Sequence, residues 1–130
     1  MDDVPRISEA EWDVMEVLWD RSPLSATEVA EALAERRDWS PTTIKTMLAR
    51  LVRKGALETA QDGRRYLYSP AVTRETCRAA ATETFVERVM GGSASPLLAW
   101  FVEQERLDAD ELDELRRLID EAPPSKRRKR

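Results

Sequence analysis

Apolar residues recur with the period of an α-helix along most of this 130-residue chain. In residues 40–54 they fall on one face of a helical wheel: Ile44, Met47, Leu48 and Leu51. Residues 73–90 and 108–121 also carry single apolar stripes, whereas residues 95–106 are apolar nearly all round and need burial on several sides. The pattern predicts six helices, near residues 8–20, 25–36, 40–54, 73–90, 95–106 and 108–121.

The starts of these helices carry capping signals. Three fit a capping box, in which a cap oxygen and a carboxylate three residues later satisfy free backbone N–H groups: Ser8 with Glu11, Ser25 with Glu28, and Asp108 with Glu111. Ser40-Pro41 and Ser95-Pro96 are expected to start two more helices, with proline at the first helical position. Gly55 and the Gly91-Gly92 pair are expected to end the helices before them.

The stretch after the third helix has the pattern of two short strands. Residues 57–60 and 64–69 flank a Gln-Asp-Gly turn, which predicts a β-hairpin. Tyr66 and Tyr68 alternate on one face of this hairpin, and we expect both to pack it against the helices. The predicted fold class is therefore mainly α, with a small β-hairpin.

The formal net charge of −4 hides an uneven distribution. Residues 1–35 hold two arginines and ten acidic residues, whereas residues 36–70 hold eight basic residues and three acidic ones. Residues 71–125 are acidic again, and residues 126–130 are all basic, so that 122–130 is expected to be a disordered basic tail. A positive stripe between acidic flanks is typical of a protein that binds nucleic acid.

The third predicted helix combines the positive stripe with side chains suited to DNA. Its polar face carries long donors, hydroxyl groups and a methyl group, which can reach phosphates, base edges and thymine methyls. Helices 25–36 and 40–54 have helix-turn-helix spacing, and the following hairpin has arginines beside its tip. This predicts an N-terminal winged helix. The predicted DNA-binding residues are Ser40, Thr42, Thr43, Lys45, Thr46, Arg50, Arg53, Lys54, Arg64 and Arg65.

Other classes of function have less support. An enzyme would need a nucleophile with a base, a metal set or a phosphate loop, and the chain has no histidine and no glycine-rich loop, so no catalytic, cofactor or metal site is predicted. The alternative that stays open is a winged-helix protein–protein interaction module without specific DNA binding.

The chain has no long apolar run, no signal-peptide pattern and a single cysteine, Cys77, from which we expect a cytoplasmic protein.

Three blocks of the sequence resemble the penicillinase-repressor (BlaI/MecI-type) family of transcriptional regulators. They are ISEAEWDVMEVLW at residues 7–19, TIKTMLARLVRKG at residues 43–55 and GRRYLYSP at residues 63–70. The resemblance extends from about residue 5 to residue 121, in order and at matching spacing. It implies a homodimer that binds an inverted-repeat operator in double-stranded DNA through the third helix and the wing, and that represses transcription.

The resemblance also implies a division into domains. Residues 1–71 would be the winged-helix DNA-binding domain and residues 72–121 a three-helix dimerisation domain, followed by the tail at 122–130. We expect these helices to interlock with those of a second copy in an isologous two-fold interface, rather than to form a private core packed on the winged helix. The residues predicted at this interface are Phe85, Val89, Leu97, Leu98, Trp100, Phe101, Leu112, Leu115, Leu118 and Ile119.

The signal that relieves repression is left open by the resemblance. Family members that respond to β-lactams are inactivated by proteolysis in the fifth helix, usually at an Asn-Phe bond, and the corresponding bond here is Trp100-Phe101. Copper-responsive relatives carry a C-terminal cysteine cluster, which this chain lacks. A regulatory protease or another sensor is therefore the further partner to consider, with Trp100-Phe101 as the candidate cleavage bond.

Overall fold

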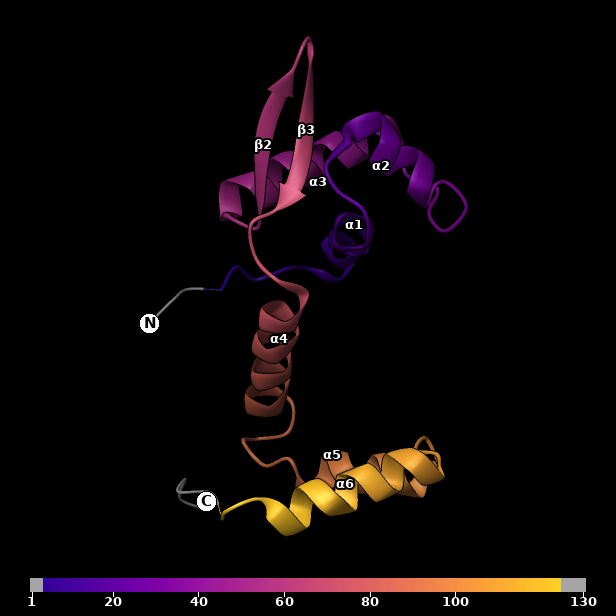
Figure 1. Ribbon diagram of the computed structural model, residues 1–130, viewed down its shortest axis with the longest axis vertical. Coiled ribbons are helices and arrows are strands. Elements are labelled where there is room, and N and C mark those ends of the chain that lie inside the picture. Colours follow the sequence, from indigo (N-terminus) through magenta and orange to yellow (C-terminus); the bar gives the residue numbers. More distant parts are fainter. Residues whose placement is uncertain (1–3, 125–130) are drawn as a thin grey trace. The chain divides into compact units, whose positions relative to one another are not determined.

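The computed structural model describes residues 4–124, in which six helices and three strands form (Figure 1). The elements are α1 (Glu9–Asp20), β1 (Leu24–Ser25), α2 (Ala26–Leu33), α3 (Pro41–Lys54), β2 (Leu57–Asp62), β3 (Arg65–Pro70), α4 (Arg74–Arg88), α5 (Ser95–Glu103) and α6 (Ala109–Glu121). All six predicted helices are present, and each starts within one residue of its predicted start. The ends were predicted less well, because α2 and α5 each stop three residues early.

Local capping explains where most helices begin. The three predicted capping boxes form, with Ser8, Ser25 and Asp108 each accepting a hydrogen bond from the backbone of the glutamate three residues on. The predicted start of α5 at Ser95-Pro96 was off by one residue, because Ser95 is the first helical residue and Pro96 the second. Ala94 occupies the cap position there and offers no side-chain hydrogen bond. Of the predicted tail at residues 122–130, residues 125–130 lie outside the described residues.

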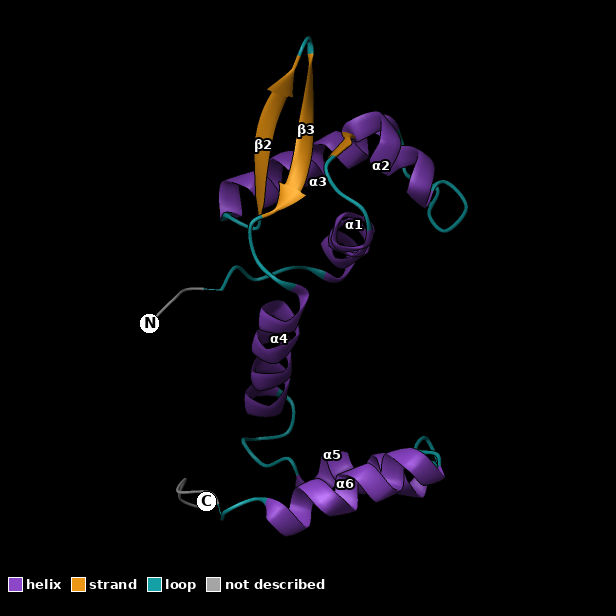
Figure 2. Cartoon of the chain, viewed as in Figure 1, coloured by secondary structure: helices purple, strands orange, loops and turns teal. Residues whose placement is uncertain are grey.

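The three strands form one small antiparallel sheet (Figure 2). The predicted hairpin forms from β2 and β3, and β3 also pairs with β1, which gives the strand order β1-β3-β2. Strand β1 was not predicted, since two residues are too short to show an alternating pattern. Its register places Leu24 opposite Tyr68, so the base of β3 is paired on both sides.

The core lies between α1, α2, α3 and the base of the sheet. Its fully buried side chains include one apolar stripe from each helix: Val14, Met15 and Leu18 from α1, Val29 and Leu33 from α2, and Ile44, Leu48 and Leu51 from α3. Tyr68 packs against this core as predicted. The same prediction for Tyr66 was wrong, because its side chain is 54% exposed in the outer half of the hairpin, opposite Gln61.

The chain divides into two compact units, Met1–Thr84 and Phe85–Arg130. The first contains the winged helix and the start of α4, and the second contains the end of α4 with α5 and α6. In the second unit, none of residues 85–124 is buried. Among the described helices, none is both long enough and apolar enough to cross a membrane.

Candidate nucleic-acid interface

Helix α3 has a sharply defined start and end. Ser40 Oγ accepts a hydrogen bond from Thr43 N at 3.1 Å, and Pro41 follows at the first position of the helix. Gly55 ends the helix with a φ of 89°, in the left-handed region that favours glycine. Between these ends, four apolar side chains face the core and the opposite face stays exposed to solvent. The helix therefore presents one continuous polar surface.

A buried carboxylate from α1 anchors the C-terminal end of α3. Glu11 is 1% exposed, and its Oε1 accepts a hydrogen bond from Lys54 Nζ at 2.5 Å. Lys54 Nζ also donates to the backbone oxygen of Arg6 at 2.8 Å. Glu11 Oε2 is buried and accepts no hydrogen bond from the described residues, and Arg50 Nη1 lies 3.8 Å from it. Two cations of α3 thus share one carboxylate of α1.

The charged state of Glu11 depends on these partners. Burial alone would raise the pKa of its carboxyl group, because the charged form loses water. The hydrogen bond from Lys54, followed by that from the Ser8 backbone, outweighs burial and holds the pKa below its usual value of 4.5. Glu11 is therefore ionised near neutral pH and keeps Lys54 turned towards α1, away from the exposed face of α3.

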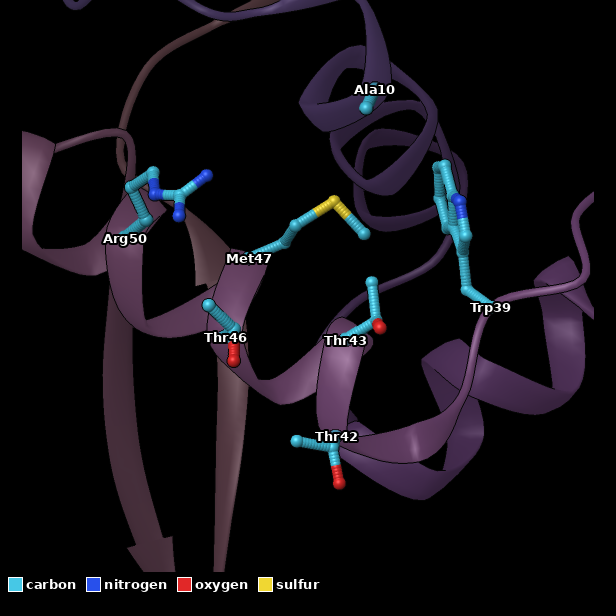
Figure 3. A pocket seen from close by; sticks show the side chains of 7 residues that line it. All are labelled: Ala10, Trp39, Thr42, Thr43, Thr46, Met47 and Arg50. Carbon is cyan, nitrogen blue, oxygen red and sulfur yellow. The ribbon is translucent and has the colours of Figure 1, made fainter.

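A depression lies beside the exposed face, between α3 and the N-terminal part of α1 (Figure 3). It is lined by Ala10, Trp39, Thr42, Thr43, Thr46, Met47 and Arg50. In the close view, the hydroxyl groups of Thr42 and Thr46 point away from α1, whereas the side chains of Arg50 and Met47 lie on the α1 side of the helix. The hydroxyls are therefore free to meet a ligand from solvent, and the Arg50 guanidinium must reorient to join them.

The other predicted cations have different surroundings. Lys45 and Arg53 are exposed on α3 and form no ion pair within residues 4–124. Arg64 lies exposed in the turn between β2 and β3, at the tip of the wing. Arg65 pairs with Asp62 across the tip, with Nη2 3.3 Å from Oδ2. The structure therefore brings together an exposed helix face and a basic wing tip in one unit.

The turn before α3 is held by residues that the sequence did not single out for the site. Arg37 Nε donates to Asp13 Oδ2 at 2.5 Å, and the Arg37 guanidinium lies over the ring of Trp39, with Cζ 5.1 Å from its centroid. Trp39 in turn lines the depression and packs against the core. These contacts fix the turn to α1. The arginine pair before Trp39 is visible in the sequence, but its acidic partner, 24 residues before Arg37, is brought to it only by the fold.

A helix-turn-helix whose second helix exposes basic and hydroxyl side chains, followed by a two-stranded wing, defines this chain as a winged-helix DNA-binding protein. The family model described as "Penicillinase repressor" matches residues 7–121. The chain belongs to the penicillinase-repressor family, as its three sequence blocks predicted.

Known relatives match over most of the chain. The penicillinase repressor of Bacillus licheniformis is 35% identical over 121 residues, covering 93% of this chain and 94% of its own. The methicillin resistance regulatory protein MecI of Mammaliicoccus sciuri is 35% identical over 113 residues, covering 87% of this chain and 92% of its own. The predictions of a transcriptional repressor, and of a protein that is not an enzyme, are confirmed by this family.

One solved relative was determined with DNA. The solution structure of the monomeric form of Bacillus licheniformis BlaI in complex with the blaP half-operator is 43% identical to this chain, with a TM-score of 0.51. The match covers 58% of this chain and 92% of that one. The similarity is therefore strong over little more than half of this chain.

Proposed function

We propose that this protein is a dimeric repressor that binds an inverted-repeat operator through α3 and the wing. The observation that carries this proposal is the exposed face of α3, where Thr42, Lys45 and Thr46 have free polar groups beside a basic wing tip. A helix of 14 residues fits the major groove, which is roughly 12 Å wide. The solved complex of BlaI with a half-operator supports binding of operator DNA by a winged helix of this family.

The contacts of each predicted residue suggest different roles on DNA. We assign Thr42, Lys45 and Thr46 to base edges, and Arg53 and Arg64 to phosphates, because all five side chains are exposed. Ser40 and Thr43 bind each other at the cap, with their hydroxyl oxygens 3.1 Å apart, and so shape the start of the helix. Lys54 is engaged by Glu11, and Arg65 by Asp62, so we assign these two mainly supporting roles.

Dimerisation is supported by the lack of buried side chains in residues 85–124. An apolar groove on α5 and α6 is lined by Leu98, Phe101, Leu107, Leu115 and Leu118, with acidic side chains along its edge. Further apolar side chains of this unit are exposed to solvent by about two fifths to two thirds of their surface: Phe85, Val89, Trp100 and Ile119. A second copy would cover this surface, since three helices of this size bury too little alone.

The decisive experiment is to select bound duplexes from a random library with the full chain, and then to measure affinity for the enriched motif. We expect an inverted repeat, and a slope of log affinity against log salt of about −0.9 for each phosphate contacted. A flat salt response, or equal affinity for the repeat and a scrambled duplex, would contradict the proposal and favour an interaction module instead.

We also propose that the protein acts in the cytoplasm and that cleavage at Trp100-Phe101 is one route to its release from DNA. The two rings pack edge to face, with centroids 5.2 Å apart, within helix α5. A helix must unfold locally before a protease can cut it. Cleavage at this bond would break α5 and so destroy the proposed interface. Mass spectrometry of the protein from β-lactam-treated cells tests this. A fragment starting at Phe101 supports cleavage, and derepression with an intact chain contradicts it.

A further inference from the structure

Arg74 ties the first turn of α4 to the last turns of α1. Its Nε donates to Glu16 Oε1 at 3.0 Å, and its Nη2 donates to Asp20 Oδ1 at 2.8 Å. The same guanidinium lies over the ring of Trp19, with Cζ 5.5 Å from the centroid. The hydrogen bond to Asp20, more than that to Glu16, raises the pKa of Arg74 further above its usual value. One fixed cation therefore binds three side chains of α1 at once.

The segment just before Arg74 is also attached to α1. Trp19 Nε1 donates to the backbone oxygen of Val72 at 2.9 Å, and the Trp12 ring packs edge-on against Trp19, with centroids 5.5 Å apart. Thr73 Oγ1 then accepts a hydrogen bond from Thr76 N at 3.1 Å and caps the start of α4. The chain is thus held on α1 immediately before and at the start of this helix.

The attachment of α4 is concentrated in this short stretch. Within residues 74–84, only Cys77 is buried, and only Arg74 and Ala80 are partly buried, while the other side chains are exposed. Helix α4 nevertheless continues to Arg88, past Thr84, where the first compact unit ends. The direction in which α4 leaves the winged helix therefore depends on few contacts, among which the Arg74 cluster supplies the charged ones.

We propose that Arg74, Glu16 and Asp20 determine which spacing between operator half-sites the protein accepts. This inference rests on the dimer in the proposed function, in which α4 links each winged helix to the paired helices. Each added base pair moves a half-site by roughly 3.4 Å and rotates it by roughly 35°. A fixed direction of α4 lets both α3 helices dock at one spacing only. When the attachment of α4 is loosened, the two α3 helices can also dock at a changed spacing.

The residue types suit this positioning role. A planar guanidinium can bind two carboxylates and stack on an aromatic ring at the same time, whereas a lysine ammonium is a point charge on a flexible stem. Arg74→Lys should therefore keep the charge but lose much of the directional hold. Arg74 is a positioning residue, since it lies outside the predicted DNA-binding face.

The test uses full-length protein and duplexes that carry the selected half-sites at their selected spacing, or with one or two base pairs added or removed. A duplex with a single half-site measures docking of one winged helix alone. The variants are Arg74→Met, Arg74→Lys and Glu16→Gln. The matched control is Arg78→Met on the same helix, because Arg78 is exposed and forms no ion pair within residues 4–124. Thermal unfolding confirms that each variant is folded.

We expect the wild type and Arg78→Met to lose about tenfold or more in affinity when two base pairs are inserted, because the second half-site is rotated out of reach. Arg74→Met should lose only about two- to threefold in affinity when the same two base pairs are inserted, and its affinity for a single half-site should be unaltered. The losses of affinity of Arg74→Lys and Glu16→Gln should be intermediate. If base pairs added or removed between the half-sites lower the affinity of Arg74→Met as steeply as that of the wild type, the inference is overturned. If the wild type itself prefers no paired site over scrambled DNA, the proposed function fails instead.

Discussion

The two compact units bury their apolar side chains very differently. The first encloses a continuous core in which eight large side chains are fully buried or nearly so, together with the carboxylate of Glu11. The second has no buried residue among positions 85–124, and its apolar side chains line an open groove or face solvent. The first unit therefore has the means to fold alone, whereas the second is suited to folding against another surface. DNA binding by the first unit and the proposed dimerisation through the second would place these opposite demands on the chain.

The largest expected effect comes from truncating the core of the first unit. Leu48→Ala removes a side chain with no exposed surface and should lower the free energy of unfolding by roughly 3–5 kcal/mol. Urea denaturation, monitored by circular dichroism, measures this free energy. The matched change Leu118→Ala, at a side chain that is 49% exposed, should leave unfolding of the first unit unaltered. Equal losses for both variants would remove the contrast between the units.

A second substitution tests whether the charge of Glu11 supports the first unit. Glu11→Gln keeps the shape of the side chain but leaves Lys54 without its anionic partner, which should lower stability by roughly 1.5–3 kcal/mol at pH 7. Because the folded-state pKa of Glu11 is lowered, its contribution is present above the usual pKa of 4.5 and is lost as pH falls through the folded value. The wild type and the variant should therefore converge in stability below that pH, as urea denaturation at several pH values would show. A constant difference would contradict this linkage.

The dimer prediction applies to the second unit. Ile119→Glu places a charge on a side chain that is 59% exposed, so it should leave the folded monomer intact and weaken dimerisation by about tenfold or more, roughly 1.4 kcal/mol. Sedimentation velocity over a range of concentrations measures the change. The control Arg116→Glu also lies on exposed α6 but alters no apolar surface. A wild type that stays monomeric at all concentrations would contradict the predicted interface.

The last prediction concerns the end of α3. Gly55 has a φ of 89°, and a Cβ at this position would meet no atom within 4 Å. Gly55→Ala should therefore cost only backbone strain, about 1–2 kcal/mol, without disturbing packing. Thermal unfolding measures the stability, and affinity for a single half-site should remain unchanged. A large loss of affinity at unchanged stability would show that the end of α3 takes part directly in DNA binding.

Much of the first unit could be predicted from sequence because its signals are local. Capping boxes and helical periodicity lie within a few residues, and they gave the helix starts and the buried face of α3. The two-residue β1 could not be found, because its pairing with β3 depends on residues more than 40 positions away. Tyr66 was misplaced for a related reason, since alternation gives the face of a strand but not how far the helices reach along it.

The candidate site shows the same limit. The helical wheel identified the exposed face of α3 correctly, and Lys45, Thr46 and Arg53 are indeed exposed. It could not separate free cations from engaged ones. Glu11 has the sequence signature of a capping residue, and its capping bond with Ser8 forms. Its second role, holding Lys54 from 43 residues away, arises only when α1 packs across the end of α3.

The pairing of Leu24 with Tyr68 and the bond from Trp19 to Val72 also set an order of events during synthesis. These contacts join α1 and β1 to β3 and to the segment that follows it. The winged helix is therefore complete once residues just beyond Val72 have left the ribosome. At roughly 5–20 residues per second, translation of the rest of the chain then takes a few seconds. We therefore expect each new chain to acquire a finished winged helix before it meets a second copy. The supply of paired repressor would then be limited by the encounter of chains rather than by their folding.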